Sequence, residues 1–225
     1  MNNISIRVEG LYKRFGAQAV LRNISFIHKN GILGIEGPNG SGKSTLMKCM
    51  AGLNSPTKGS VIWKKDGDEI KFTAFRNHLG YAAPYINLYD ELTCFENLRF
   101  LLDLRNIKPS NSRINGFLRQ VNMQSFSSHI FRNLSTGQRQ RMRIAAALVP
   151  NPEVLFLDEP GSNLDDQGHR MIQEVVASFN QADKPVIIAS NDKRELELCD
   201  KIFSVEKERF KHGHSRSDKN ETKNF

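Results

Sequence analysis

Residues 37–44 combine residue types and a spacing that are suited to holding phosphate groups. The run reads Gly-Pro-Asn-Gly-Ser-Gly-Lys-Ser and matches the pattern G-x-x-x-x-G-K-[ST]. Its small residues allow successive backbone N–H groups to converge on phosphate oxygens at the start of a helix. We therefore predict a nucleotide site in which Lys43 holds the β- and γ-phosphates and Ser44 ligates Mg²⁺. The residues expected to contact the nucleotide here are Gly37, Pro38, Asn39, Gly40, Ser41, Gly42, Lys43, Ser44 and Thr45.

A second stretch, residues 154–159, is an apolar run that ends in two carboxylates. At the end of a strand, Asp158 can reach the Mg²⁺ ion and Glu159 can polarise an attacking water. Many strands end in acidic residues, so this pattern is informative only beside the phosphate loop. Together the two stretches predict hydrolysis of the bound nucleotide.

Alternating strands and helices position both stretches. An apolar strand at residues 32–36 leads into the phosphate loop, and Leu46, Met47 and Met50 mark the helix that follows it. The alternation continues toward the C-terminus, which predicts an α/β fold with a parallel sheet covered on both faces. The later elements are expected at residues 139–148 (helix), 154–157 (strand), 167–179 (helix), 186–189 (strand) and 202–205 (strand).

A small antiparallel sheet is predicted at the start of the chain. Residues 4–8 and 20–27 have the apolar pattern of strands. Residues 63–72 add to them, with Asp66-Gly67 as a hairpin turn.

A helical lobe is predicted from residue 92 to about residue 130. It begins with residues 93–96, whose Thr93 and Glu96 fit a capping box. Phe95, Leu98 and Leu101 then mark one apolar face of a helix.

The composition is that of an ordinary globular protein. With 225 residues, of which 39% are hydrophobic and 25% charged, the chain suits one large folded unit with a small appended lobe. No apolar run approaches the roughly 20 residues that cross a bilayer, and the first ten residues alternate like a strand instead of forming a signal peptide. We expect the protein to stay in the cytoplasm.

The three cysteines, Cys49, Cys94 and Cys199, are far apart in the sequence and form no C-x-x-C pair. This spacing argues against a disulfide framework or a zinc site. We expect buried or inert thiols.

The formal net charge is +8, and much of the excess comes from the polar end of the chain. A solvated basic surface and attraction to anionic lipid headgroups are the two readings of this charge. Residues 208–225 lack apolar periodicity and are predicted to be a disordered tail, in which a solvated role for His212 and His214 is favoured over metal binding. The tail has no interleaved arginine and aromatic residues, so no nucleic-acid partner is expected.

The segment Leu134-Ser135-Thr136-Gly137-Gln138-Arg139-Gln140 resembles the LSGGQ signature of the ATP-binding-cassette (ABC) ATPase family. The resemblance covers nearly the whole chain, because the phosphate loop, helical lobe, signature, Asp158-Glu159 pair and residues 162–165 stand in the family's order. It implies the P-loop NTPase fold of ABC ATPases, with a mainly parallel RecA-like core, an antiparallel β subdomain and a helical subdomain at about residues 85–140. One such domain is expected to occupy residues 1–207.

The resemblance also implies how the nucleotide is enclosed. Ser135 and Gly137 begin a helix, so their N–H groups and the helix dipole form an anion site without a phosphate of its own. In the family this site, with Gln138, completes the ATP pocket of a partner chain. Two ABC ATPase chains, identical or related, are therefore expected to dimerise head to tail around two ATP molecules.

Two more nucleotide contacts follow from the resemblance. Asp165 ends the segment that matches the family's D-loop. Phe15 stands where the family places an aromatic side chain that stacks on adenine. Tyr12 is the alternative stacking residue, and a simple core role is the other reading of Phe15.

Two positions depart from the family's pattern. Pro84 stands where the family has the glutamine of the Q-loop, and it has no side-chain oxygen for Mg²⁺ or water. Asn191 stands at the switch histidine; it can donate a hydrogen bond to the γ-phosphate but cannot carry a proton. Hydrolysis is expected to persist on Glu159 as base with Lys43 and Mg²⁺ as charge stabilisers, at a slower turnover.

The resemblance implies an ATP-hydrolysing subunit of an ABC transporter on the inner face of the cell membrane. Integral membrane permease subunits, separate from this chain, would bind the transported substrate. Residues 87–100, with Pro84 and Asn191, are similar to haem-exporter-like and drug-exporter-like subunits. The alternatives are an ABC ATPase with a non-transport role, such as regulation of a membrane or cell-wall complex, and a nucleotide-binding module without turnover, against which the retained Glu159 argues.

Overall fold

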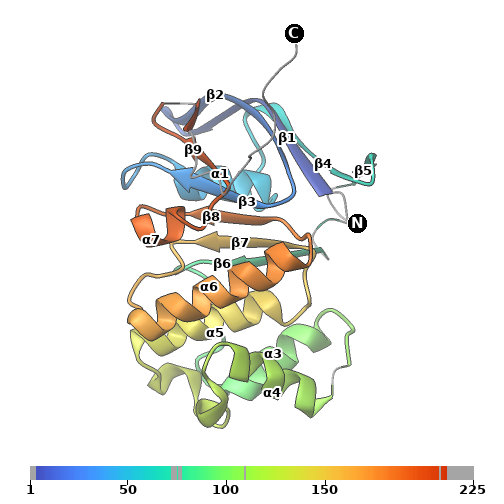
Figure 1. Cartoon of the computed structure of the whole chain (residues 1–225), viewed down its shortest axis with the longest axis vertical. Helices are drawn as coiled ribbons and strands as arrows, with labels where there is room; N and C mark the ends of the chain where they lie inside the picture. Colours follow the sequence, from blue (N-terminus) through green and yellow to red (C-terminus); the bar gives the residue numbers. More distant parts are fainter. Residues whose placement is uncertain (1–3, 72–74, 76–77, 109, 208, 212–225) are drawn as a thin grey trace, which may run out of the picture.

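The structure is a computed structural model and describes residues 4–71, 75, 78–108, 110–207 and 209–211. Figure 1 shows an antiparallel sheet at one end, a mainly parallel sheet in the middle and a group of helices at the opposite end. This arrangement confirms the predicted α/β architecture with an added antiparallel sheet and helices.

The mainly parallel sheet has the strand order β10-β9-β3-β8-β7-β6. Neighbouring strands from β9 to β6 run parallel, and the edge pair of β10 and β9 is antiparallel. The strands are β3 (Ile32–Glu36), β6 (Leu79–Ala82), β7 (Val154–Asp158), β8 (Val186–Ala189), β9 (Lys201–Ser204) and β10 (Arg209–Lys211).

Two of these strands differ from the sequence-based expectations. No strand was expected at β6, which forms an edge beside β7. The last strand, β10, falls inside the predicted disordered tail, so regular structure continues to Lys211, past the predicted boundary at residue 207. Residues 212–225, including His212 and His214, lie outside the described residues.

The register of the sheet brings the ends of its inner strands together. Ala189 is opposite both Ile35 of β3 and Asp158 of β7, and Ala82 of β6 is opposite Leu157. The loops that follow these strands therefore leave the same edge, which is where open parallel sheets bind their ligands.

The antiparallel sheet consists of β1 (Ile4–Phe15), β2 (Gln18–Lys29), β4 (Lys58–Lys65) and β5 (Asp68–Ile70) in the order β2-β1-β4-β5. Asp66 and Gly67 both have positive φ, 54° and 96°, as the predicted two-residue hairpin turn requires. Helix α1 (Lys43–Met50) lies between the two sheets, where Trp63 Nε1 donates to the carbonyl oxygen of Met50 over 2.9 Å.

Helices α5 and α6 cover the opposite face of the parallel sheet, and α3 and α4 pack beyond them (Figure 1). The capping box at Thr93 and Glu96 is present. The helices are α3 (Cys94–Asp103), α4 (Asn111–Gln120), α5 (Thr136–Leu148), α6 (Asp166–Gln181) and the short α7 (Lys193–Leu196), with 3₁₀ turns at Gln124–Phe126 and Phe131–Asn133.

Cys49, Cys94 and Cys199 are all buried and free, as predicted. Within the described residues no group of histidine, cysteine and acidic side chains is arranged to hold a metal ion by itself. None of the helices in that part of the chain is both long and apolar enough to span a membrane.

Candidate nucleotide-binding site

The phosphate loop joins β3 to α1, as the sequence predicted. Gly40 and Gly42 have φ of 81° and 104°, a left-handed conformation that glycine adopts without strain. A Cβ at Gly42 would also lie 2.8 Å from Leu21 Cδ2. The loop borders a pocket of about 470 Å³ lined by Val20, Asn39, Gly40, Gly42, Lys43, Ser44, Thr45, Glu159 and Ser162.

Lys43 lines this pocket although its side chain is nearly buried. Its Nζ donates to the carbonyl oxygen of Gly37 over 2.8 Å and lies 3.2 Å from Glu159 Oε1. The structure therefore brings together the predicted phosphate-binding lysine and the predicted base.

Ser44 and Asp158 meet at the predicted metal position. Ser44 Oγ donates to Asp158 Oδ1 over 3.1 Å. Asp158 as a whole is only 1% exposed. A hydroxyl and a carboxylate beside a phosphate loop are the oxygen ligands that Mg²⁺ prefers. These residues fit a Mg²⁺ site.

The backbone of Glu159 is in the left-handed region, with φ of 48°, which is strained for a residue with a side chain. Its N–H donates to the carbonyl oxygen of Ala189 at the end of β8. Gln140, a buried residue of α5, donates from Nε2 to the carbonyl oxygen of Pro160 over 3.0 Å and lies 3.5 Å from that of Glu159. These bonds fix the turn that presents the Glu159 carboxylate to the pocket.

Asn191 follows β8 and lies beside the phosphate loop. Its Nδ2 donates to Asn39 Oδ1 over 2.9 Å. The amide is thus next to the loop, and donation from Asn191 to the γ-phosphate remains a prediction.

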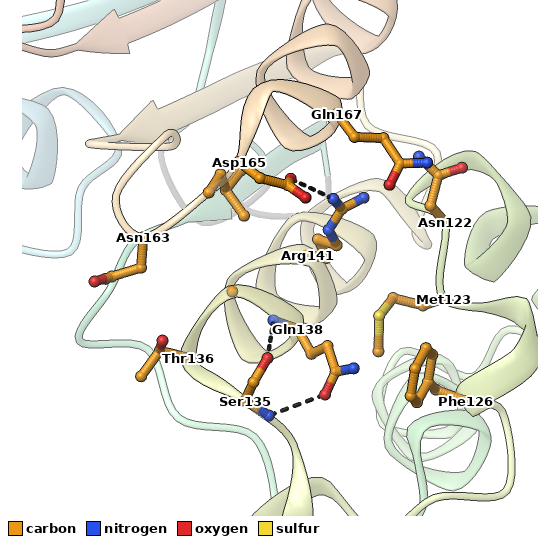
Figure 2. A pocket seen from close by; sticks show the side chains of 12 residues that line it. Asn122, Met123, Phe126, Ser135, Thr136, Gln138, Arg141, Asn163, Asp165 and Gln167 are labelled. Carbon is orange, nitrogen blue, oxygen red and sulfur yellow. Dashed lines mark hydrogen bonds and ion pairs between the residues drawn. The ribbon is translucent and has the colours of Figure 1, made fainter.

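The signature residues lie at a second pocket of about 450 Å³ at the start of α5 (Figure 2). Ser135 is the N-cap, and its Oγ accepts from the Gln138 N–H while Gln138 Oε1 accepts from the Ser135 N–H. The expectation that the Ser135 N–H is free for an anion is therefore wrong. The N–H groups that the first turn leaves unbonded to the described chain are those of Thr136 and Gly137.

Asp165 belongs to this second pocket and not to the phosphate loop. Its Oδ1 accepts from the Gly168 N–H, which caps α6, and lies 2.8 Å from Arg141 Nη2. Figure 2 shows the Asp165–Arg141 pair bridging α6 and α5. Nucleotide contact by Asp165 remains a prediction, and the geometry adds a structural role.

Phe15 ends β1 with 51% of its surface exposed, so the core reading of this residue is wrong. Lys13 Nζ lies 4.9 Å from its ring centroid. Tyr12 is half-buried. Adenine stacking by Phe15, with Tyr12 as the alternative, remains a prediction.

Sequence reasoning missed two tyrosines at the site. Tyr81 of β6 and Tyr85 in the following loop both place their hydroxyls at Asp158 Oδ2, at 3.3 and 3.0 Å. Pro84, between them in sequence, is exposed. Two tyrosines four residues apart form no known motif, and only the pairing of β6 with β7 reveals their position.

A phosphate loop that follows a buried strand, with an acidic pair at the end of a strand in the same parallel sheet, defines a P-loop nucleotide-binding protein. The sequence also matches the ABC transporter family over residues 21–162. The chain belongs to this family.

Named relatives agree with this assignment. The chain is 35% identical to the probable multidrug ABC transporter ATP-binding protein YbhF of Escherichia coli K12 over 89% of its length, and 34% identical to the Fe(3+) ions import ATP-binding protein FbpC 2 of Haemophilus influenzae over 92%. It spans only 35% and 60% of the lengths of these relatives.

Solved structures share the fold. A dimeric, post-hydrolysis state of the ATP-binding cassette MJ0796 bound to ADP and Pi superposes with a TM-score of 0.79 at 26% identity. The match covers 88% of this chain and 93% of that one. The fold is therefore that of an ABC ATPase cassette.

Proposed function

We propose that this chain binds and hydrolyses ATP as one of two cassettes that drive separate membrane-spanning subunits of an ABC transporter. The observation that carries the proposal is the convergence of Lys43, Ser44, Asp158 and Glu159 on the phosphate loop, with Lys43 Nζ 3.2 Å from Glu159 Oε1 and Ser44 Oγ 3.1 Å from Asp158 Oδ1.

Each side chain has one task in this proposal. Lys43 binds the β- and γ-phosphates. The phosphates thereby compete with the Glu159 carboxylate for the positive charge of Lys43. Glu159, whose side chain is about one-third exposed, then orients a water for in-line attack and accepts its proton. Asn191 donates a neutral hydrogen bond toward the γ-phosphate, so it stabilises less charge than a histidinium would.

Ser44 and Asp158 are the residues that would hold Mg²⁺. When bound, the ion would neutralise charge on the transferred phosphate. The task of the protein is to present one hydroxyl and one carboxylate oxygen in fixed positions, and the hydrogen bond between them keeps both oriented.

The signature pocket supports a head-to-tail dimer. It lies apart from the phosphate-loop pocket, and two helix N–H groups face it, from Thr136 and Gly137. A γ-phosphate bound to the loop of a second chain is a suitable partner for these donors. MJ0796, a cassette of the same fold, was solved as a dimer, which supports pairing of two cassettes.

A transport role follows from family membership and from the names of the relatives. Those names describe multidrug transport in one case and Fe(3+) import in another, so the proposal covers the ATP-driven step and not the cargo. Permease subunits would bind the cargo and hold this chain at the inner face of the membrane. The similarity of residues 87–100 to haem-exporter-like and drug-exporter-like subunits remains part of this proposal.

The test of hydrolysis compares Glu159→Gln with Glu153→Gln. Glu153 precedes the same strand, β7, at its other end, where it pairs with Lys65. We expect Glu159→Gln to retain ATP binding and lose at least about 100-fold in turnover, which is the lower end of the usual contribution of one acid–base group. Glu153→Gln should hydrolyse ATP at the wild-type rate. Equal rates in Glu159→Gln and wild type would refute the role of Glu159.

The test of the transport role uses the same variant. Glu159→Gln protein, tagged and isolated with ATP from detergent-solubilised native membranes, should carry a stoichiometric multi-span membrane protein identified by mass spectrometry. Recovery of only soluble, cell-wall or nucleic-acid partners would replace transport with another ABC ATPase role.

A further inference from the structure

Two tyrosine hydroxyls converge on the carboxylate of Asp158. Tyr85 Oη donates to Asp158 Oδ2 over 3.0 Å, and Tyr81 Oη lies 3.3 Å from the same oxygen. The two hydroxyls are also 2.7 Å from each other. With Ser44 on Oδ1, both oxygens of the carboxylate are held by neutral hydroxyl groups.

Both rings are fixed by packing that does not involve Asp158. Tyr81 is opposite Phe156 of β7, and the two rings stack with centroids 5.8 Å apart. The ring of Tyr85 lies under Lys48 of α1, whose Nζ is 3.9 Å from the ring centroid. The Tyr81 hydroxyl is therefore positioned by strand β6, and the Tyr85 hydroxyl by a loop that packs against α1.

The tyrosines serve this carboxylate as hydrogen-bond donors. An ordinary phenol has a pKa of about 10 and is therefore protonated at neutral pH. A protonated phenol orients a carboxylate without removing its negative charge.

We propose that Tyr81 and Tyr85 are positioning residues for the metal site, which hold the Asp158 carboxylate in the orientation that binds Mg²⁺. The proposal rests on the proposed function, because it takes Asp158 and Ser44 as the metal-holding pair. Pro84 has no polar side chain that could contact the metal site from this loop. The next residue, Tyr85, does bring a polar group there, because its hydroxyl donates to the Asp158 carboxylate. Partners that hydrogen-bond a metal-binding carboxylate commonly change metal affinity by about 10- to 100-fold.

The experiment removes only the hydroxyls. Tyr81→Phe, Tyr85→Phe and the double variant keep both rings, including the ring under Lys48. Tyr89→Phe is the matched control, because Tyr89 lies in the same loop region, is 53% exposed, and contacts Phe100 through its ring rather than Asp158. Thermal unfolding checks that each variant is folded.

Metal affinity is measured directly and without turnover. Mn²⁺ serves as the probe, followed by electron paramagnetic resonance in the presence of a non-hydrolysable ATP analogue. We expect each single variant to weaken Mn²⁺ binding several-fold and the double variant about 10-fold or more, whereas Tyr89→Phe binds like wild type. Binding of the analogue in EDTA should be the same in all variants.

Other outcomes overturn the proposal. Unchanged Mn²⁺ affinity in the double variant would show that the hydroxyls contact Asp158 without affecting metal binding. Tighter Mn²⁺ binding would show that the hydroxyls compete with the metal for the carboxylate. An equal loss in Tyr89→Phe would show a non-specific effect. If wild type itself binds no Mn²⁺ with the nucleotide analogue, the proposed metal pair is wrong, and the proposed role of the tyrosines is wrong with it.

Discussion

Gln140 Nε2 lies 3.0 Å from the carbonyl oxygen of Pro160 and ties α5 to the turn that carries Glu159. On its other side, Gln140 Oε1 is 3.4 Å from Arg143 Nη1, and Arg143 Nε donates to the carbonyl oxygen of Ile86. One buried amide thus links the loop after β6 to the strained backbone of the proposed base.

Replacing Gln140 with leucine should therefore slow hydrolysis. The left-handed turn at Glu159 loses a hydrogen bond that maintains it, so the carboxylate no longer holds water in line. We expect turnover to fall roughly 10-fold at unchanged nucleotide affinity. Steady-state ATPase assays and fluorescent-nucleotide titrations measure the two quantities, and Gln173→Leu on the exposed face of α6 is the control. A change in affinity without a change in turnover would contradict this role.

Gly137→Ala should impair the signature pocket. A Cβ at this position would lie 2.9 Å from the carbonyl oxygen of Asn163, so α5 or the segment before α6 would have to shift. We expect the isolated chain to bind nucleotide normally, while ATP-dependent dimerisation in the Glu159→Gln background weakens severalfold. Analytical ultracentrifugation measures the dimer.

Gly116→Ala provides the control for that substitution. Gly116 lies on α4, and a Cβ there meets no atom within 4 Å. Alanine favours a helix over glycine, so this variant should dimerise normally and be slightly more stable. If both glycine variants dimerise like the parent, Gly137 has no part in the interface.

Asp165 should matter for stability through two separable interactions. Asparagine is as good an N-cap as aspartate, so Asp165→Asn removes chiefly the charge that pairs with Arg141, whereas Asp165→Ala removes the cap as well. We expect the melting temperature to be highest for wild type, lower for Asp165→Asn and lowest for Asp165→Ala. Asp166→Ala is the neighbouring control, with only a 3.6 Å contact to Arg194. Equal melting temperatures for the Asn and Ala variants would deny Asp165 a capping role.

Glu195 should make stability depend on pH near neutrality. Burial raises the pKa of its carboxyl to about 7, and the nearby carboxylates of Asp192 and Glu159 add to the rise. The folded chain therefore binds a proton that the unfolded chain releases between about pH 4.5 and 7. Across that window, stability must decrease as pH rises.

Glu195→Gln tests this dependence, because the amide keeps the shape of the side chain without a charge. Relative to the variant, wild type should lose roughly 2–3 kcal/mol between pH 5 and pH 8. Urea unfolding at both pH values gives the difference. His169 also packs against Gly161, so His169→Gln separates any contribution of the imidazole. A constant difference between wild type and Glu195→Gln would mean that Glu195 stays charged throughout.

The sequence predicted the elements whose signals are local. The phosphate loop, the Asp66-Gly67 turn and the Thr93 capping box each depend on residues within a few positions, and all three are present. Apolar strands in the buried sheet were equally clear, because both of their faces are covered and their apolar runs are continuous.

Features that depend on distant segments were not predictable in this way. β6 contains Gly80, where a Cβ would lie 2.2 Å from the carbonyl oxygen of Ala147 in α5. Glycine is therefore required here by the close contact with α5, although it has a low strand propensity. Tyr85 likewise acquires its position only when β6 pairs with β7 and α1 supports its ring. The occupied Ser135 N–H could have been foreseen, because Ser-x-x-Gln is itself a capping-box pattern.

The buried cysteines make the chain convenient for spectroscopic labelling. Burial raises the pKa of Cys94 to about 11 and that of Cys199 to about 12, and it raises the pKa of Cys49 as well. Because thiolates are the species that react with maleimides, the folded chain should remain unlabelled until it unfolds. A cysteine introduced at an open surface position, such as Gly116→Cys, would then carry the label alone. Spin-label distances between two chains could follow their closure around ATP in an otherwise native sequence.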